Sequence, residues 1–332
     1  MVLNVTMKDV NYDVIVERNS LRKVKEYFDL NRKVLILTDS GVPQEYASIV
    51  KNASLDGYIY TITQGESSKS FENYGLILDY MVEHAFSRTD VVVAVGGGVV
   101  GDLAGFVSAT YMRGIDFYNV PTTLLSQVDS SIGGKTAIDK AGIKNVVGAF
   151  YPPKKVLIDS ETLKTLDIRQ LHSGLVEAIK MGATNNLELF TLIEESQDLL
   201  ADIDEIIIES LKIKKAVVEE DPKEQGIRKV LNFGHTVGHA VEASGKFNDL
   251  LHGECVGLGM LAFSSEKVKE RIIKILEKYH LPVQVHLTGD ELFKYISLDK
   301  KRSGNYLSII YVEQIGTFEI KKILLEEIKE YL

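Results

Sequence analysis

The spacing of hydrophobic residues changes about halfway along the chain. In the first half, short β-rich runs alternate with stretches whose apolar positions recur at helical spacing. The predicted strands are 14–17, 33–38, 58–63, 91–95, 117–120 and 154–159, and the predicted helices are 20–28, 43–53, 71–86 and 99–110. VVVAV at 91–95 is apolar throughout, which is typical of a strand covered on both faces. This alternation predicts a mainly parallel sheet with helices on both sides.

Helical periodicity dominates after about residue 165. The predicted helices are 171–184, 187–198, 203–220, 229–244, 253–280 and 289–297, and a hairpin is expected near 305–320 before a final helix. The change predicts an α/β Rossmann-like domain over 1–165, followed by an all-α domain over 166–332. Ligand sites are expected at the carboxyl ends of the strands and in a cleft between the domains.

Composition and charge narrow the classes of function. The 332 residues are 45% hydrophobic and 26% charged, which is ordinary for a globular protein. The chain lacks the roughly 18-residue apolar run that spans a bilayer, and its start lacks the pattern of a signal peptide, so no membrane partner is expected. The single Cys255 excludes an intrachain disulfide, so a reducing, cytoplasmic setting is expected. A net charge of −9 argues against a nucleic-acid partner.

A glycine-rich turn follows the most apolar strand. GGGVVGD at 96–102 fits G-x-G-x-x-G, in which backbone N–H groups can approach a phosphate at a helix N-terminus. The motif alone also fits an ordinary strand-to-helix turn, and it lies later than the first βαβ unit. Polar segments at the ends of other strands, TDSG at 38–41, QGESSKS at 64–70 and VPTTLLSQVDSSIGGKT at 120–136, favour a dinucleotide site, although each could be a helix cap.

Histidines and a glutamate in the second half form a candidate metal constellation. NFGHTVGHAVE places His235 and His239 one helical turn apart, GLVEAIKMG carries Glu177, and LHGE carries His252. One carboxylate with two or three imidazoles suits zinc or a similar divalent ion that keeps an open position. The spacing alone leaves three readings of the pair: two ligands, two core histidines, or one ligand and one base. Cys255 is taken as a small buried residue rather than a ligand.

Basic residues recur beside glycine-rich and apolar segments of this acidic chain. They are Arg113, Lys135, Lys144, Lys214 and Arg228. Their placement favours an anionic substrate that carries phosphate and carboxylate groups. The alternative is that such basic residues lie on solvent-exposed helix faces and bind no substrate. This alternative fits Lys212 and Lys215 well, but it fits Lys135, which follows two glycines, poorly.

From about residue 30 to 320 the chain resembles the 3-dehydroquinate synthases. The matching motifs are GGGVVGDLAGFVSATYMRG, VPTTLLSQVDSSIGGKTAIDKAGIKNVVGAFY, GLVEAIKMG, GIRKVLNFGHTVGHAVE and LHGE, in that order. The resemblance implies a dehydroquinate synthase-like fold and a phosphorus-oxygen lyase of the shikimate pathway, which leads to aromatic amino acids. The implied reaction converts 3-deoxy-D-arabino-heptulosonate 7-phosphate to 3-dehydroquinate and phosphate. Implied cofactors are catalytic NAD and a divalent metal, zinc with cobalt as the alternative.

The resemblance also implies a role for individual residues. Metal ligands are Glu177, His235 and His252, and proton acceptors are Glu224 and His239. NAD contacts are Asp39, Glu66, Lys69, Gly97, Gly98, Val99, Asp102, Thr122, Thr123, Lys144, Thr162, Leu163, Lys164 and Thr165. Substrate contacts are Asp129, Lys135, Asn145, Lys180, Lys214, Arg228, Asn232 and either Lys300 or Lys301, and of these Lys135, Asn145, Lys180, Lys214 and Arg228 are also expected to take part in catalysis. Arg113 matches an arginine that enters the neighbouring subunit's site, so a homodimer is expected. The predicted helix over 229–244 would then carry Asn232, His235 and His239 along one stripe.

Two other enzyme classes fit parts of this pattern. A 2-deoxy-scyllo-inosose or valiolone-type cyclase would share the NAD loop and the metal ligands, but its substrate lacks a carboxylate. Arg113 and the Lys300-Lys301 pair favour a substrate that has one. A polyol dehydrogenase of the glycerol dehydrogenase type would instead consume NAD stoichiometrically. A binding protein without catalytic activity is disfavoured, because every expected ligand position is filled.

Overall fold

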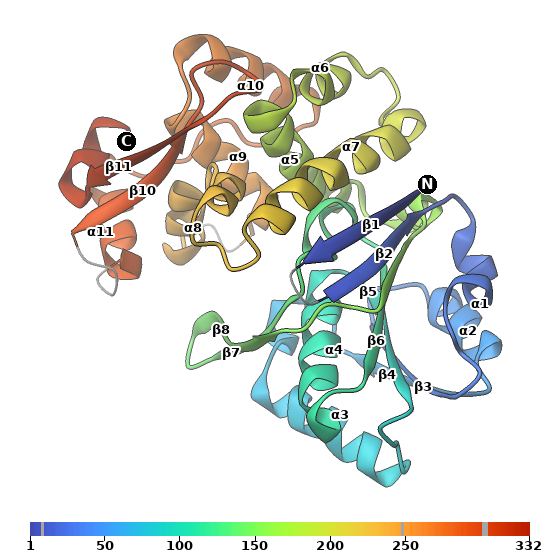
Figure 1. The fold of residues 1–332 in the computed structure, drawn as a ribbon. Helices are drawn as coiled ribbons and strands as arrows, with labels where there is room; N and C mark the ends of the chain where they lie inside the picture. Colours follow the sequence, from blue (N-terminus) through green and yellow to red (C-terminus); the bar gives the residue numbers. More distant parts are fainter. Residues whose placement is uncertain (8–9, 247–248, 301–304) are drawn as a thin grey trace. The chain divides into compact units, whose positions relative to one another are not determined.

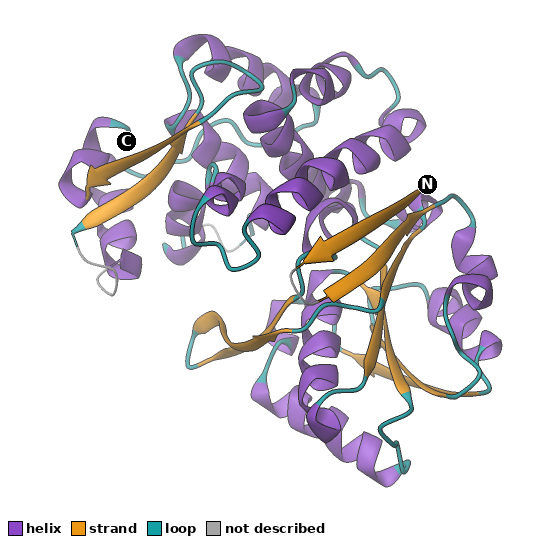
Figure 2. Cartoon of the chain, in the orientation of Figure 1, coloured by secondary structure: helices purple, strands orange, loops and turns teal. Residues whose placement is uncertain are grey.

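The computed structural model describes residues 1–7, 10–246, 249–300 and 305–332, and it divides into two compact units, Met1–Asp167 and Ile168–Leu332 (Figure 1). The first unit is an α/β structure and the second is mainly helical (Figure 2). A parallel-dominated sheet followed by a helical region is the predicted fold class, and this prediction is confirmed. No helix in the described ranges combines the length and apolar character needed to span a bilayer.

The first unit is organised around a seven-stranded sheet in the order β1-β2-β9-β6-β5-β3-β4. Its strands are β1 (Val2–Met7), β2 (Val10–Val16), β3 (Lys33–Asp39), β4 (Asp56–Ile62), β5 (Val91–Gly96), β6 (Asp116–Pro121) and β9 (Lys155–Ile158). All neighbouring pairs are parallel except β1 and β2. The helices are α1 (Val24–Tyr27), α2 (Gln44–Ala53), α3 (Phe71–Glu83) and α4 (Gly98–Thr110).

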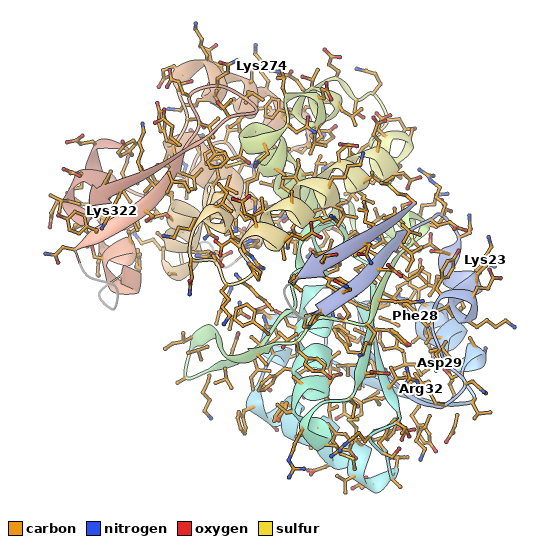
Figure 3. The ribbon with its side chains drawn as sticks, in the orientation of Figure 1. Lys23, Phe28, Asp29, Arg32, Lys274 and Lys322 are labelled. Atoms are coloured by element: carbon orange, nitrogen blue, oxygen red, sulfur yellow. The ribbon has the colours of Figure 1, made fainter. Side chains whose placement is uncertain are left out.

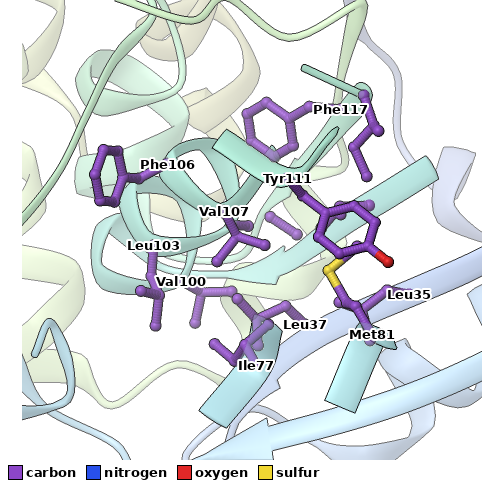
Figure 4. Packing of buried hydrophobic residues seen from close by; sticks show 14 of the residues in the cluster. Leu35, Leu37, Ile77, Met81, Val100, Leu103, Phe106, Val107, Tyr111 and Phe117 are labelled. Atoms are coloured by element: carbon purple, nitrogen blue, oxygen red, sulfur yellow. The ribbon is translucent and has the colours of Figure 1, made fainter. Parts of the chain in front are cut away.

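Both faces of this sheet are buried, which explains the uninterrupted apolar run in β5. Val92 and Ala94 face a cluster that includes Leu37, Ile77 and Leu103, on the side of α3 and α4 (Figure 4). Alternate residues of the same strand, Val91, Val93 and Val95, face a second cluster on the side of α1 and α2. Since side chains alternate between the faces of a strand, a strand covered on both sides needs apolar residues throughout.

A short segment before β3 is tied to the sheet by an aromatic and a charged contact. Arg32 donates from Nη1 to Asp116 at 2.8 Å, and the rings of Phe28 and Tyr118 stack with centroids 4.4 Å apart. Phe28, Asp29 and Arg32 are labelled together in Figure 3, where the exposed Lys23 lies on the same unit. These contacts tie the segment before β3 to β6.

Two strand features were missed by the hydrophobic pattern. β1 pairs with β2 at the sheet edge, and β7 (Lys135–Lys140) pairs with β8 (Ile143–Phe150) as a separate antiparallel hairpin. The first half of β8 is exposed, so its sequence shows no buried alternation that would mark a strand. The hairpin carries three predicted site residues, Lys135, Lys144 and Asn145.

The second unit is built from helices and one hairpin. Its elements are α5 (Ile168–Asn185), α6 (Leu187–Glu195), α7 (Leu199–Glu220), α8 (His235–Ala243), α9 (His252–Ala262), α10 (Glu266–Lys278), α11 (Gly289–Lys300), β10 (Tyr306–Tyr311) and β11 (Glu319–Leu324). Two 3₁₀ segments, Ile227–Asn232 and Leu325–Glu330, complete it. The hairpin lies near the predicted position, whereas the predicted final helix is the second of these 3₁₀ segments.

Two long predicted helices are wrong, because tertiary contacts divide them. The prediction over 229–244 is interrupted at Gly234, whose φ of 80° is left-handed and whose backbone lies against Val256 of α9. The prediction over 253–280 is interrupted where Val312 donates to the carbonyl of Phe263 and accepts from the amide of Ser265. At the second break, these hydrogen bonds to the residue that follows β10 replace hydrogen bonds within a helix. The helical spacing of apolar residues continues across both breaks, so the sequence pattern does not reveal them.

Candidate metal and dinucleotide sites

Three predicted metal ligands lie together in the second unit. Glu177 is on α5, His235 is the first residue of α8, and His252 is the first residue of α9. Glu177 Oε1 lies 3.4 Å from His252 Nε2 and 3.9 Å from His235 Nε2, and one ligand atom from each residue lies within 4.8 Å of the others. Three residues separated by up to 75 positions thus direct one oxygen and two nitrogens at one point. This donor set suits zinc or a similar divalent ion.

Glycines allow these helices to approach closely enough for the donors to meet. A Cβ atom on Gly253 would lie 1.9 Å from the carbonyl oxygen of Ser173 on α5. A Cβ atom on Gly238 would lie 3.0 Å from the carbonyl oxygen of Cys255 on α9. Side chains at these positions would push α9 away from α5 and α8. The local sequence therefore encodes the site both through its ligands and through the residues that set the helix separation.

The carboxylate of Glu177 shows whether the site fits a cation. Its side chain is 1% exposed, and Oε2 accepts a hydrogen bond from Lys180 Nζ. Oε1 is buried and has no hydrogen-bond partner among the described residues. A buried oxygen without a partner is energetically costly unless another group compensates it. A divalent ion between Oε1 and the two imidazole nitrogens would supply that compensation, so the residues fit a metal.

The three ligands have differently shifted pKa values in the metal-free protein. Burial would raise the pKa of Glu177, but the charge of Lys180 and the nearby imidazoles of His252 and His235 hold it well below its usual range. Burial and the charge of Lys180 lower the pKa of His235 to about 3, so that ring is neutral. Burial opposes the charged form of His252, but Glu177 and Glu242 outweigh it and raise its pKa to about 10. A metal ion must therefore displace one proton, from His252.

In both candidate histidine ligands, His252 and His235, the ring nitrogen Nδ1 contacts a hydrogen-bond acceptor. His252 Nδ1 lies 2.9 Å from Glu242 Oε1, and His235 Nδ1 lies 3.2 Å from the backbone carbonyl of Phe233. Metal-binding imidazoles ordinarily have such outer partners, which fix the ring orientation. Sequence reasoning missed Glu242, although it closes the NFGHTVGHAVE motif two helical turns after His235. The signal that could have found it is its position on the ligand-bearing face of the helix.

The two residues predicted as proton acceptors lie on different elements of the second unit, and His239 lies beside the candidate ligands. His239 is exposed on α8, and its ring centroid is 5.3 Å from that of His235. Glu224 precedes the first 3₁₀ segment, and its Oε1 accepts from Asn232 Nδ2 at 2.5 Å. Asn232 ends that segment and is not part of α8. The prediction that Asn232, His235 and His239 share one helical stripe is therefore wrong, because Gly234 turns the chain between them.

Burial separates the predicted basic contacts into two groups. Among the residues whose side chains are described, the most buried Lys and Arg residues are Lys69, Lys180, Lys214 and Arg228, each 5% exposed or less. All four are predicted site residues. Arg113, Lys135, Lys144 and Lys164 are exposed, as is Lys212, for which a solvated helix face was the alternative. Burying an ammonium or guanidinium group costs free energy unless a partner compensates its charge. The burial of these four side chains is therefore consistent with a role in binding anionic groups.

In the first unit, the glycine-rich turn lies at a reversal of strand order. β3 is flanked by β4 on one side and by β5 on the other, so the chain changes direction across the sheet between β4 and β5. Asp39 ends β3, and Gly97 lies between β5 and α4. Thr122 follows β6 and donates its amide to Gly96. Doubly wound sheets bind ligands at such points. The position of the glycine motif after the first βαβ unit is therefore compatible with a dinucleotide site.

A buried lysine joins residues from three segments of this unit. Lys69 Nζ lies 2.8 Å from Asp102 Oδ2 on α4 and 3.4 Å from Glu66 Oε1, and it donates to Asn145 Oδ1 on β8. Asn145 has a left-handed φ of 54°, and its backbone N–H donates to Asp139 Oδ1 at 2.7 Å. The structure therefore brings together three predicted NAD contacts and one predicted substrate contact.

Other predicted NAD contacts have ordinary structural partners. Thr162 donates to the carbonyl of Asp159 at 2.8 Å and Thr165 donates to that of Thr162 at 3.0 Å, as capping hydroxyls do. Leu163 is 1% exposed, and Lys164 pairs with Glu161 at 2.8 Å. Local partners therefore account for these side chains, and their contact with NAD stays a prediction.

The structure gives each remaining predicted residue a location. Val99 is on α4, and Thr123 follows Thr122 before the π-helical turn Ser126–Ser130, which contains Asp129. Lys135 begins β7, Lys144 is on β8, and Arg113 follows α4 with a left-handed φ of 67°. Lys300 ends α11, and Lys301 lies outside the described residues.

Comparison with known proteins gives matches over both halves of the chain. Residues 59–173 match the family model described as 3-dehydroquinate synthase N-terminal, and residues 174–302 match the corresponding C-terminal model. The chain is 42% identical over 352 aligned residues to a 3-dehydroquinate synthase from Enterococcus faecalis (strain ATCC 47077 / OG1RF), covering 100% of this chain and 98% of the relative.

Solved structures with similar folds include two sugar-phosphate cyclases. A 2-epi-5-epi-valiolone synthase from Streptomyces hygroscopicus, with NAD⁺ and Zn²⁺ bound, has a TM-score of 0.87 at 26% identity and covers 98% of this chain and 97% of its own. A 2-deoxy-scyllo-inosose synthase, complexed with carbaglucose-6-phosphate, NAD⁺ and Co²⁺, has a TM-score of 0.85 at 23% identity and covers 100% of each chain.

Proposed function

Because the chain belongs to the 3-dehydroquinate synthase family, we propose that it converts 3-deoxy-D-arabino-heptulosonate 7-phosphate to 3-dehydroquinate and phosphate. The observation that carries the proposal is the convergence of Glu177, His235 and His252 beside the buried Lys180, within a chain that matches the family over both halves. Two cyclases that share the fold but are only 23% and 26% identical are less similar to this chain than the 42% identical synthase.

NAD and a divalent metal are part of the proposal. The solved valiolone-type cyclase holds NAD⁺ with Zn²⁺, and the inosose synthase holds NAD⁺ with Co²⁺. Here Glu177, His235 and His252 would hold the metal, and the turn around Gly97 with Asp39 and the Lys69 cluster would hold the dinucleotide. When bound, the metal polarises a substrate hydroxyl and the dinucleotide takes up and returns a hydride.

The protein's own residues would bind and orient the anionic substrate. Lys180 occupies one oxygen of Glu177, so this carboxylate offers the metal its other oxygen, Oε1. Lys214 and Arg228 are buried cations of the same unit, suited to a phosphate or a carboxylate. Arg228 already donates to the carbonyl of Pro222 at 2.7 Å, which holds its guanidinium plane in place. Lys135, Asn145, Asp129 and one of Lys300 or Lys301 complete the proposed contacts.

Proton movement needs acceptors near the reacting carbons. His239 is exposed one helical turn beyond His235, so it can exchange protons with solvent. Glu224 is held by Asn232, which orients its carboxylate. We assign both as proton acceptors during phosphate elimination, with the departing phosphate as a further acceptor, because the ketone formed at the neighbouring carbon makes that C–H acidic.

The decisive experiment measures phosphate release. The purified protein is given Zn²⁺, a trace of NAD and, in separate reactions, the heptulosonate phosphate, sedoheptulose 7-phosphate or glucose 6-phosphate. Turnover of the heptulosonate phosphate alone, with many phosphates released per NAD, is expected. Turnover of a sugar without a carboxylate would identify another cyclase and refute the proposal. NADH that accumulates one-for-one with product, without phosphate release, would identify a polyol dehydrogenase.

Assembly and location are also proposed. Met112 and Arg113 are consecutive residues with left-handed φ, and Arg113 is exposed. We assign Arg113 to the neighbouring subunit's site in a homodimer. A sedimentation measurement that finds a fully active monomer would refute this role. We also propose a cytoplasmic location, because a chain whose one cysteine is buried and unbridged needs no oxidising compartment.

A further inference from the structure

We propose that Glu242 is a positioning residue for the metal ligand His252, holding its imidazole so that Nε2 faces the ion. The inference rests on the proposed metal site and adds a residue to it that neither the predicted ligands nor the predicted proton acceptors include. Glu242 lies on α8, two helical turns beyond His235, and reaches the first residue of α9.

The two ring nitrogens of His252 have different partners. Nδ1 is 2.9 Å from Glu242 Oε1, and Nε2 is 3.4 Å from Glu177 Oε1. An ionised carboxylate can only accept, so Nδ1 carries the proton and donates to Glu242. In the neutral ring, Nε2 then presents its lone pair toward Glu177 and the point where the ligand atoms converge. One carboxylate thus fixes both the tautomer and the direction of the ring.

His252 depends on a side chain for its orientation, unlike the other histidine ligand. His235 is held through Nδ1 by the backbone carbonyl of Phe233, a contact that no side-chain substitution removes. The side chain of His252 is 38% exposed, against 14% for His235, so surrounding packing restricts its ring less. Removing Glu242 should therefore loosen one ligand while the other two keep their positions.

A second reading places Glu242 in direct contact with the ion. His239, Glu242 and His252 also offer ligand atoms within 4.8 Å of one another. The structure favours the outer role, because His239 is exposed whereas Glu177 has a buried oxygen without a hydrogen-bond partner in the described part of the chain. The two readings differ in which substitutions remove the metal.

The test measures metal affinity of the full chain independently of activity. Zn²⁺ affinity is determined by competition with a chromophoric chelator, and the coordination is followed by the visible absorption of bound Co²⁺. The variants are Glu242→Ala, Glu242→Gln, Glu177→Ala and His239→Ala. Glu209→Ala serves as the matched control, since Glu209 is a carboxylate on α7 that pairs with Lys212 at the surface.

We expect Glu242→Ala to weaken Zn²⁺ binding about 10- to 100-fold and to change the Co²⁺ spectrum, as loss of an outer-shell partner does. Glu242→Gln should recover part of the affinity, because its amide oxygen still accepts from Nδ1, and it preserves the side-chain volume if the alanine variant unfolds. Glu209→Ala should bind as the unmodified protein does.

The outcomes separate this inference from the proposed function. If Glu177→Ala loses the metal while Glu242→Ala binds it within about twofold of the unmodified protein, the role of Glu242 is refuted and the proposed site stands. If Glu177→Ala binds Zn²⁺ normally, the proposed site itself is refuted. If His239→Ala and Glu242→Ala both abolish binding and Glu177→Ala does not, Glu242 is a ligand of a different site and the positioning role is overturned.

Discussion

Each unit of the molecule buries a lysine beside carboxylate groups, and the two clusters differ in what they leave unsatisfied. In the first unit, Lys69 contacts Asp102, Glu66 and Asn145 and joins a loop, a helix and a hairpin. In the second unit, Lys180 pairs with Glu177, whose other oxygen has no hydrogen-bond partner among the described residues.

The difference indicates two roles for a buried cation. A lysine surrounded by acceptors compensates them and holds their segments together, which is a structural role. A lysine that satisfies one oxygen of a carboxylate directs the other oxygen toward an additional positive charge. We call the Lys69 cluster closed, because its lysine contacts Asp102, Glu66 and Asn145. We call the Glu177–Lys180 cluster open, because a bound cation would give Oε1 of Glu177 a partner.

The largest effect should follow from removing the open carboxylate. In Glu177→Ala the ion loses its one anionic ligand and Lys180 loses its charge partner. Zn²⁺ binding and phosphate release should both disappear, and the variant should be less stable by about 3–5 kcal/mol, the usual cost of breaking a buried pair. Metal content after dialysis and urea unfolding measure the two effects. A variant that retains zinc and activity would show that the second cluster is closed as well.

The closed cluster should respond in stability first. Lys69→Met keeps most of the side-chain volume but leaves Asp102, Glu66 and Asn145 without their shared donor. We expect a loss of about 3 kcal/mol in the free energy of unfolding and weaker NAD binding, with unchanged Zn²⁺ affinity. Urea unfolding and fluorescence titration with NADH provide the measurements.

Lys23→Met is the matched control for this substitution. Lys23 pairs with Glu17 at 3.2 Å, but both side chains are largely exposed, so no measurable loss is expected. An equal loss in both variants would contradict a clamping role for Lys69, since exposure would then make no difference.

The open cluster should also bind its ion in a pH-dependent way. The pKa of His252 is raised to about 10, so this ring carries a proton at neutral pH in the metal-free protein, whereas His235, with a pKa of about 3, does not. One proton must therefore leave, and Zn²⁺ affinity should rise by about tenfold per pH unit between pH 7 and 9. Chelator competition at several pH values measures the slope, and a flat profile would refute the proton displacement.

The same shift predicts how the metal-free protein responds to pH. Since the folded pKa of His252 exceeds its usual 6.5, its charged form stabilises the fold. That contribution is fully present below about pH 6.5 and is lost as the pH rises toward 10. Urea midpoints of the metal-free protein should therefore fall over this interval, and bound Zn²⁺ should reverse the fall.

Sequence reasoning reached the fold where burial leaves a pattern in the residues. VVVAV predicted a strand covered on both faces, and both faces of β5 are buried. β8 was missed because its exposed residues show no alternation, and the break at Gly234 was missed because helical spacing continues across it. The ligand set of Glu177, His235 and His252 could be named from motifs. Glu242 could not, because its role depends on where α9 begins relative to α8.

The smallest effect should come from the backbone packing that assembles the open cluster. Gly238→Ala places a Cβ atom 3.0 Å from the carbonyl of Cys255, so α8 and α9 must separate by a few tenths of an ångström. We expect a loss of about 1–2 kcal/mol and a several-fold weaker Zn²⁺ affinity, because the ligands move apart. Gly75→Ala on α3 is the control, since its Cβ would meet no atom within 4 Å. That substitution should stabilise the protein by about 0.5–1 kcal/mol through helix propensity alone. If Gly238→Ala also stabilised the protein and left the zinc affinity unchanged, the close approach of the two helices would have no part in forming the site.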